Sequence, residues 1–135
     1  MNKLTGKIVH IESSDTMSIV EVEVQTDIFC SILLETPHSA SYLKTGREVT
    51  LLFKETEVSI AKNLSGLISL RNRIKAKIKR IEQEKILTKI ILDYKGNDIV
   101  SIISTGSVQR LDLREGDEVE WLVKTNEVSL FSNCT

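Results

Sequence analysis

The stretch that decides the fold occurs twice. Residues 4–11 read Leu-Thr-Gly-Lys-Ile-Val-His-Ile, and residues 74–81 read Ile-Lys-Ala-Lys-Ile-Lys-Arg-Ile. In both copies, apolar residues alternate with other residues over the first five positions, as in a strand with one buried face. The alternation then breaks at the same place, Val9-His10 in one copy and Lys79-Arg80 in the other. A break that both copies share predicts a β-bulge, which bends a strand as small barrels require.

These two strands belong to a repeat that runs through the chain. A shift of 70 residues, which places Asn2 on Asn72 and Ser59 on Ser129, aligns the sequence with itself without a gap. We therefore expect a first repeat at residues 1–62, a linker at 63–70 and a second repeat at 71–135. A unit of about 60 residues has a marginal core by itself. The halves are expected to pack on each other or on another subunit.

The order of short apolar runs predicts the fold class. In each repeat four further runs follow the first strand: 19–24, 28–34, 49–53 and 58–60, then 86–94, 99–103, 119–123 and 128–131. The runs 19–24 and 86–94 are rich in β-branched residues. Lys95-Gly96-Asn97-Asp98 is a hairpin signal, and Pro37–Lys44 and Ser107–Leu113 are typical of one or two helical turns. This order predicts an all-β protein of two tandem OB-like Greek-key β-barrels, each with about five strands and one short helix.

Composition excludes several classes of function. The 135 residues carry 18 Lys+Arg against 19 Asp+Glu, a formal net charge of -1. A protein that binds nucleic acid or a membrane surface through charge usually has a basic excess. Aromatic residues are only 4%, so we expect a core of Ile, Val and Leu. The sequence shows no long apolar run and no apolar leader, which favours a cytoplasmic protein with reduced thiols.

Residue types that carry catalysis do not cluster. His10 and His38 have no partner at metal-ligand spacing, and we find no Ser-His-Asp or Cys-His arrangement and no glycine-rich phosphate loop. We therefore expect a protein that is not an enzyme and has no direct metal ligands. Cys30 is expected to be a buried strand residue, and Cys134 to lie in a loose tail.

Three segments are rich in hydrogen-bond donors and contain no carboxylate: Ser69-Leu70-Arg71-Asn72, Ser104-Thr105-Gly106-Ser107 and Lys124-Thr125. Guanidinium, ammonium, hydroxyl and free backbone N–H groups together suit a compact oxyanion. Each segment also has an ordinary explanation. Ser104 is suited to cap a helix, Lys124 to be a solvated strand residue, and Arg71 to be a surface charge. The combination of all three favours a binding site.

The same segments resemble motifs of a known family. Ser69-Leu70-Arg71-Asn72 with the strand after it is similar to the S-A-R-N-x-L/I-x-G motif of the molybdate-binding Mop (molbindin, TOBE-like) family, with Leu70 and Ala76 where alanine and glycine are usual. Residues 110–119 resemble the R-L-x-L-x-x-G-x-x-V segment of that family, and residues 122–128 its I-K-A/S-x-x-V ending. The resemblance covers nearly the whole chain, as in a tandem, or di-Mop, protein.

This resemblance implies a ligand and a site. The ligand would be molybdate or tungstate, bound as an oxyanion without chemistry. The oxyanion-binding residues carried over are Ser69, Leu70, Arg71, Asn72, Ser104, Lys124 and Thr125, with Leu70 and Asn72 contributing their backbone. In the family the anion lies at a seam between subunits, and the hydroxyl and Lys segments commonly come from another chain. A homo-oligomer, trimer or dimer, is therefore implied.

The first repeat departs from the motif. It begins Met1-Asn2-Lys3-Leu4, without Ser or Arg, and Leu34 stands where the second repeat has Ser104. Glu35 and Glu55 replace Thr105 and Thr125, and carboxylates repel a dianion. We hypothesise that the second repeat holds the site and that the first is mainly structural.

Several roles remain open at this point. The leading one is molybdate or tungstate binding for storage, homeostasis or delivery, and the second is the ligand-sensing module of a regulatory system. An OB-fold nucleic-acid module would use the basic alternation Arg73, Lys75, Lys77 and Lys79, which we interpret as the solvated side of a strand. Aromatic residues do not interleave there, and the sequence contains neither a helix-turn-helix pattern nor the Walker motif of a transporter ATPase.

Overall fold

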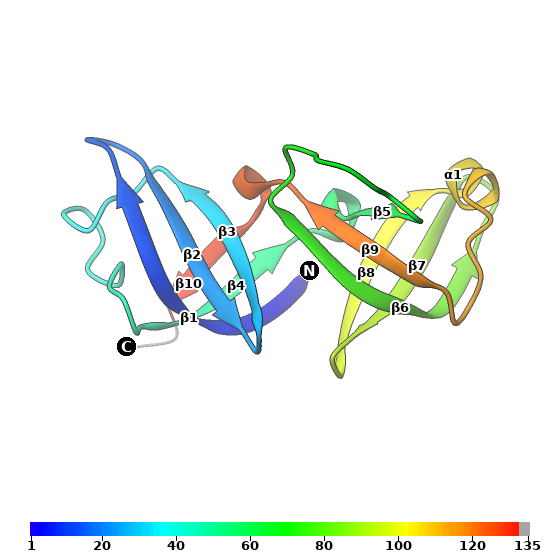
Figure 1. Ribbon diagram of the computed structural model, residues 1–135, viewed down its shortest axis with the longest axis horizontal. Helices are drawn as coiled ribbons and strands as arrows, with labels where there is room; N and C mark the ends of the chain where they lie inside the picture. The colour runs from blue at the N-terminus through cyan, green and yellow to red at the C-terminus, as the bar shows by residue number, and fades with distance from the viewer. Residues whose placement is uncertain (133–135) are drawn as a thin grey trace.

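The computed structural model describes residues 1–132 and contains two five-stranded antiparallel sheets (Figure 1). Cys134 lies outside the described residues. The strands of the first repeat are β1 Asn2–Ser13, β2 Ser18–Val24, β3 Asp27–Leu33, β4 Glu48–Phe53 and β5 Ser59–Ala61. Those of the second are β6 Asn72–Gln83, β7 Leu87–Tyr94, β8 Asn97–Ser104, β9 Glu118–Val123 and β10 Ser129–Ser132. One α-helix, α1 Thr105–Arg110, and two 3₁₀ turns, η1 Glu55–Glu57 and η2 Thr125–Glu127, complete these elements.

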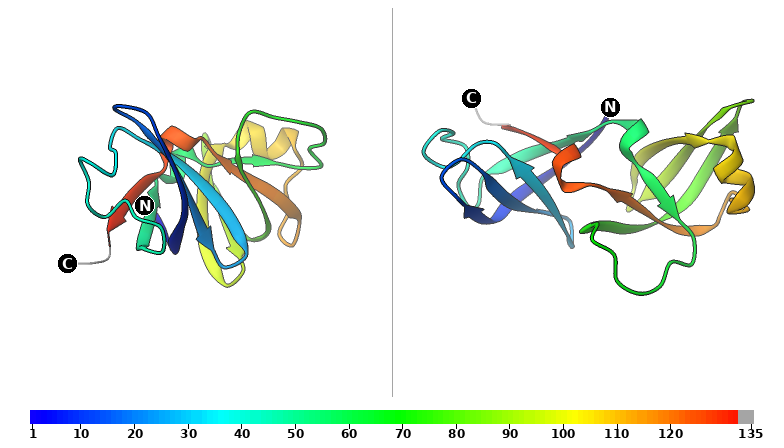
Figure 2. Two further views of the ribbon diagram at one scale, coloured as in Figure 1. Left: turned by 60° about the vertical axis from the view of Figure 1, so that its left-hand side comes forward. Right: turned by 90° about the horizontal axis from the view of Figure 1, so that it is seen from above.

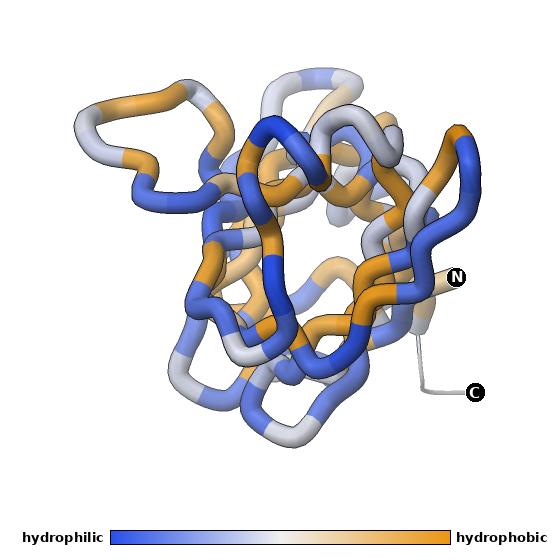
Figure 3. Tube along the Cα trace, turned by 90° about the vertical axis from the view of Figure 1, so that its right-hand side faces the viewer, coloured by the Kyte–Doolittle hydropathy of each residue, from blue (hydrophilic) through white to orange (hydrophobic). Residues whose placement is uncertain are grey.

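The predicted bulges are confirmed in both long strands. The register of β1 against β2 shifts between Ile8 and His10, and that of β6 against β7 shifts between Ile78 and Arg80. After the bulge, the side chains of each strand become exposed or half-buried. The bend lets one strand pair with different neighbours along its length, so each sheet curves into a barrel. Along the tube in Figure 3, hydrophobic and hydrophilic segments alternate as such strands require.

The two repeats exchange their last strands. The sheet orders are β10-β4-β1-β2-β3 and β5-β9-β6-β7-β8, so β10 of the second repeat pairs with β4 and β5 of the first pairs with β9. Figure 2 shows both crossings at the junction of the barrels. The division into 1–62, 63–70 and 71–135 stays a prediction about the sequence. In space, each barrel contains one strand from the other repeat, so neither barrel is complete without both.

An aromatic cluster forms the core at the junction. Phe29 and Phe53 come from the first sheet, Tyr94 and Trp121 from the second, and their ring centroids lie 5.5 to 6.1 Å apart. All four side chains are buried. The expected core of Ile, Val and Leu surrounds them within each barrel. The scarce aromatic residues are therefore concentrated where the two barrels must be held together.

A short helix forms in the second repeat, whereas the matching segment of the first repeat forms turns. Helix α1 begins at Thr105, two residues before the predicted start, because the Ser104 side chain accepts a hydrogen bond from the Ser107 N–H. In the first repeat, Leu34 occupies the capping position and has no such acceptor. Residues 37–44 there form turns, for which one hydrogen bond runs from the Ala40 N–H to the Thr36 carbonyl.

Candidate functional site

Strand pairing places the two predicted cations side by side. Strand β6 pairs with β9 so that Asn72 lies opposite Val123. Arg71 directly precedes β6 and Lys124 directly follows β9, so they are neighbours at the same end of the ladder. Both side chains are exposed, and neither forms an ion pair among residues 1–132. This end of the ladder therefore presents two uncompensated positive charges.

The pair lies at the junction of the barrels (Figure 1). The turn η2, which begins after Lys124, is held against β3 of the first sheet by a hydrogen bond of 2.5 Å from the Ser31 hydroxyl to the Val128 carbonyl. Around the pair, Ser69 is exposed, and Leu70 and Thr125 are half-buried. The structure thus brings Ser69, Leu70, Arg71 and Asn72 together with Lys124 and Thr125.

The side chain of Asn72 is not free to bind a ligand. It is fully buried, and its Oδ1 accepts from the Cys30 N–H at 2.7 Å while its Nδ2 donates to the Cys30 carbonyl at 2.8 Å. The whole residue is buried, so its backbone, which the resemblance implies as a donor, is not open to solvent in this chain either. The sequence motif indicated Asn72 as a binding residue and gave no sign of these two hydrogen bonds to Cys30 on the other sheet.

Cys30 in β3 of the first barrel lies next to the candidate residues. Burial raises the pKa of the Cys30 thiol, while the positive charge of Arg71 acts on it in the opposite direction. Because Arg71 directly precedes Asn72, whose side chain bonds to the Cys30 backbone, the candidate residues lie next to β3 of the first barrel. Cys30 itself is buried, as the sequence predicts.

Ser104 lies away from these residues. It precedes α1, which occupies the far end of the second barrel in Figures 1 and 2. Its hydroxyl shares a hydrogen bond of 2.8 Å with the Ser107 hydroxyl and caps the helix. Within one chain, Ser104 is a helix cap and cannot complete the site around Arg71 and Lys124. Lys124, in contrast, is brought to Arg71 by the same chain, whereas the resemblance implied that it commonly comes from another.

The corresponding position of the first repeat is occupied by acidic groups. Glu55 stands where Thr125 does and accepts a hydrogen bond of 2.7 Å from the amino group of Met1, which holds the pKa of this carboxyl below its usual value. At the far end of the first barrel, Glu35 accepts from the Tyr42 hydroxyl at 2.7 Å, and Leu34 is 82% exposed. Each place thus holds a carboxylate, which opposes a dianion.

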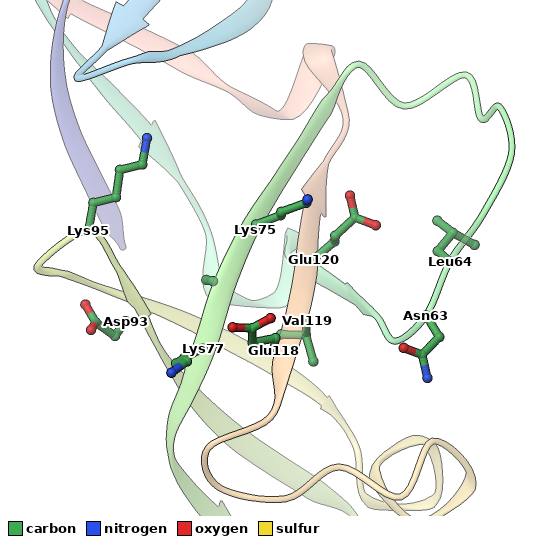
Figure 4. A pocket seen from close by; sticks show the side chains of 10 residues that line it. Asn63, Leu64, Lys75, Lys77, Asp93, Lys95, Glu118, Val119 and Glu120 are labelled. Atoms are coloured by element: carbon green, nitrogen blue, oxygen red, sulfur yellow. The ribbon is translucent and has the colours of Figure 1, made fainter.

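A surface groove of about 480 Å³ lies outside this constellation. It runs over β6 and β9 beneath the linker, and Figure 4 shows basic and acidic side chains interleaved along it. Its charged lining residues are Lys75, Lys77, Lys95, Asp93, Glu118 and Glu120. In the ladder Lys75 lies opposite Glu120 and Lys77 opposite Glu118. Because the charges balance, the groove offers a dianion no net attraction.

Two further findings concern the residues that the structure describes. Residues 1–132 contain no group of three or more His, Cys, Asp or Glu side chains that could hold a metal ion. No helix among them is long and apolar enough to cross a membrane.

Comparison with known proteins gives relatives of two kinds. Molybdenum-pterin-binding proteins 1 and 2 of Clostridium pasteurianum are each 35% identical over 66 residues, which is 48% of this chain and 97% of each relative. The structure of the cytoplasmic molybdate-binding protein ModG with molybdate bound has the same fold, with a TM-score of 0.90 and 24% identity over 97% of this chain and 95% of that one. The TOBE domain model matches residues 1–60 and 68–130. The chain therefore belongs to the TOBE domain family, which it matches twice in tandem.

Proposed function

We propose that this chain binds molybdate or tungstate in the cytoplasm, as a binding protein rather than an enzyme. The observation that carries the proposal is the pairing of Arg71 with Lys124 at the end of the β6–β9 ladder, without a carboxylate partner among residues 1–132. The relatives support it, since their names describe molybdenum-pterin and molybdate binding.

A tetrahedral dianion would replace its hydration shell by hydrogen bonds from this cluster. Arg71 and Lys124 supply charge-assisted hydrogen bonds, which are about twice as strong as neutral ones. The hydroxyls of Ser69 and Thr125 and the backbone N–H of Leu70 supply neutral donors. No covalent bond of the anion is made or broken in this binding.

The exposure of both cations supports completion of the site by a second copy. In one chain the anion would remain open to water on one side, where screening weakens every charged contact. Ser104, which the structure places at the far end of the barrel, can reach the site only from another subunit. We therefore propose a homo-oligomer, trimer or dimer, with anion sites at the seams between subunits.

We assign the site to the second repeat and a structural role to the first. Glu55 holds a negative charge where the second repeat has Thr125, and Leu34 replaces Ser104. Storage, homeostasis or delivery of molybdenum is the role that needs only such a site.

Isothermal titration with molybdate, tungstate and sulfate tests the proposal. Arg71→Ala and Lys124→Ala should each weaken molybdate binding about tenfold to a hundredfold, because each removes a hydrogen bond from a charged group. Lys54→Ala is the matched control, since Lys54 holds the position of Lys124 in the first repeat. It should leave the affinity within about twofold. Unchanged affinity in both Arg71→Ala and Lys124→Ala would refute the assignment.

A further inference from the structure

Two asparagine side chains make the same contact in the two halves of the molecule. Asn72 exchanges two hydrogen bonds with the backbone of Cys30, at 2.7 and 2.8 Å. Asn2 exchanges two with the backbone of Val100, its Nδ2 donating at 2.9 Å and its Oδ1 accepting at 2.8 Å. Both side chains are buried. We call each of these arrangements an amide clamp.

Each amide clamp seals an edge of a sheet. Strand β3 is the last strand of the first sheet and β8 is the last strand of the second. An edge strand presents N–H and C=O groups that no neighbouring strand satisfies. A carboxamide carries both a donor and an acceptor, so it satisfies one such pair of groups as a neighbouring strand would. The clamp thereby ties the start of β6 to the first barrel and the start of β1 to the second.

The surroundings of the two clamps differ. Asn72 directly follows Arg71 and lies opposite Val123, which directly precedes Lys124. The Asn72 clamp therefore determines where both cations lie relative to β3. The Asn2 clamp adjoins the Met1–Glu55 ion pair, whose carboxylate opposes an anion. The chain thus contains a clamp beside the candidate site and an equivalent clamp away from it.

We propose that Asn72 is a positioning residue for the oxyanion site, which it holds in place through its clamp on Cys30. This inference rests on the proposed function. The clamp fixes the backbone between Arg71 and β6 against the other barrel, so the two cations are arranged before the anion arrives. Preorganised charges bind more tightly because less ordering remains to be done on binding. Energetic coupling between two sites is reciprocal, so a bound anion must in turn hold the clamp closed.

Paired substitutions separate positioning from stability. Asn72→Ala and Asn2→Ala each remove two hydrogen bonds and leave a backbone N–H and C=O unsatisfied. Both should lower the melting temperature similarly, by roughly 5–15 °C for a domain of this size. Isothermal titration should then show molybdate affinity reduced about tenfold or more in Asn72→Ala and within about threefold of wild type in Asn2→Ala. Equal losses in the two variants, or no loss in Asn72→Ala, would overturn the inference.

Hydrogen exchange of the unmodified protein tests the same inference even where Asn72→Ala fails to fold. Saturating molybdate should slow exchange of the Cys30 amide about tenfold or more, because opening the clamp then also disturbs the bound anion. The Val100 amide, which is held by the other clamp, should change by less than about twofold. Equal changes at both amides contradict the role of Asn72. If the wild-type protein takes up no molybdate in the titration, the proposed function itself fails, and the two failures are thus distinguished.

Discussion

Trp121 gives the sharpest prediction about stability. Its ring is fully buried between Phe29, Phe53 and Tyr94, at centroid distances of 5.5 to 5.7 Å. Trp121→Ala empties this position and should lower the free energy of unfolding by about 3–5 kcal/mol. The indole N–H, however, finds no hydrogen-bond partner among residues 1–132. A buried donor without a partner costs about 1–3 kcal/mol, so part of the stability supplied by the ring is lost to its nitrogen.

Trp121→Phe separates these two effects. The smaller ring leaves a space of about 40 Å³, whose cavity term at about 24 cal/mol per Å³ is about 1 kcal/mol and adds to the small transfer free energy of the atoms removed. Removing the unsatisfied N–H offsets this cost by a similar amount or more. The free energy of unfolding of Trp121→Phe should therefore lie within about 1 kcal/mol of the wild-type value, or above it.

Urea denaturation followed by circular dichroism measures this difference. Protein concentration must be held constant, because assembly would shift the apparent stability. Phe53→Ala is the control, since Phe53 stacks on Trp121 and has no polar atom; it should lose about 3–5 kcal/mol without any offset. A loss of about 3 kcal/mol or more in Trp121→Phe would show that the indole N–H is satisfied, and would refute the reasoning.

Two further predictions follow from close contacts. A Cβ at Gly6 would overlap the backbone oxygen of Glu23, so Gly6→Ala should lower the free energy of unfolding by about 1–3 kcal/mol. Ala76→Gly, at the matching position of the second repeat, should lower it by only about 0.5–1 kcal/mol. Urea denaturation measures both changes. Asp27 pairs with Lys95 at 2.8 Å and accepts a hydrogen bond from the Tyr94 hydroxyl at 2.6 Å. Burial raises the pKa of the Asp27 carboxyl, but these contacts together lower it more, so the net pKa lies below 3.8. Because the folded-state pKa is depressed, its contribution is present above about pH 4 and is lost as pH falls through the folded-state value. In Asp27→Asn the melting temperature should therefore fall less steeply than in wild type as the pH is lowered from about 5 to about 2. Thermal melts across this range measure the slope, and an unchanged slope would contradict the prediction.

Features encoded in short stretches could be predicted from the sequence. The bulges after Ile8 and Ile78 follow from a local break in alternation, and the turn at residues 95–96 follows from Gly96, which adopts a positive φ without steric cost. Such signals act within a few residues of the chain, so no distant contact is needed to produce them. The first repeat is the exception: helical turns were expected over residues 37–44, but no helix forms there, where Leu34 supplies no cap.

The candidate site could be predicted only in part. The motif identified Arg71 and Lys124, and the β6–β9 register then made them neighbours. Ser104 shares their chemistry but lies at the other end of the barrel, because β8 carries it away from the junction. The clamp of Asn72 on Cys30 could not be predicted from the sequence. The alignment of Asn2 with Asn72 in the repeat was nevertheless a signal that both asparagines share a role.

The sequence by itself determined the strands, their bulges, the twofold repeat and the candidate residues for an oxyanion site. Only the tertiary structure decided which sheet each last strand joins. Residues 59–61 and 129–132 carry similar patterns, so local preference does not distinguish pairing within a repeat from exchange between repeats. The exchange places Phe29, Phe53, Tyr94 and Trp121 in one core and brings β3 against the Arg71–Lys124 pair. Two small barrels with marginal cores gain stability by sharing one core, and the candidate site lies where they join.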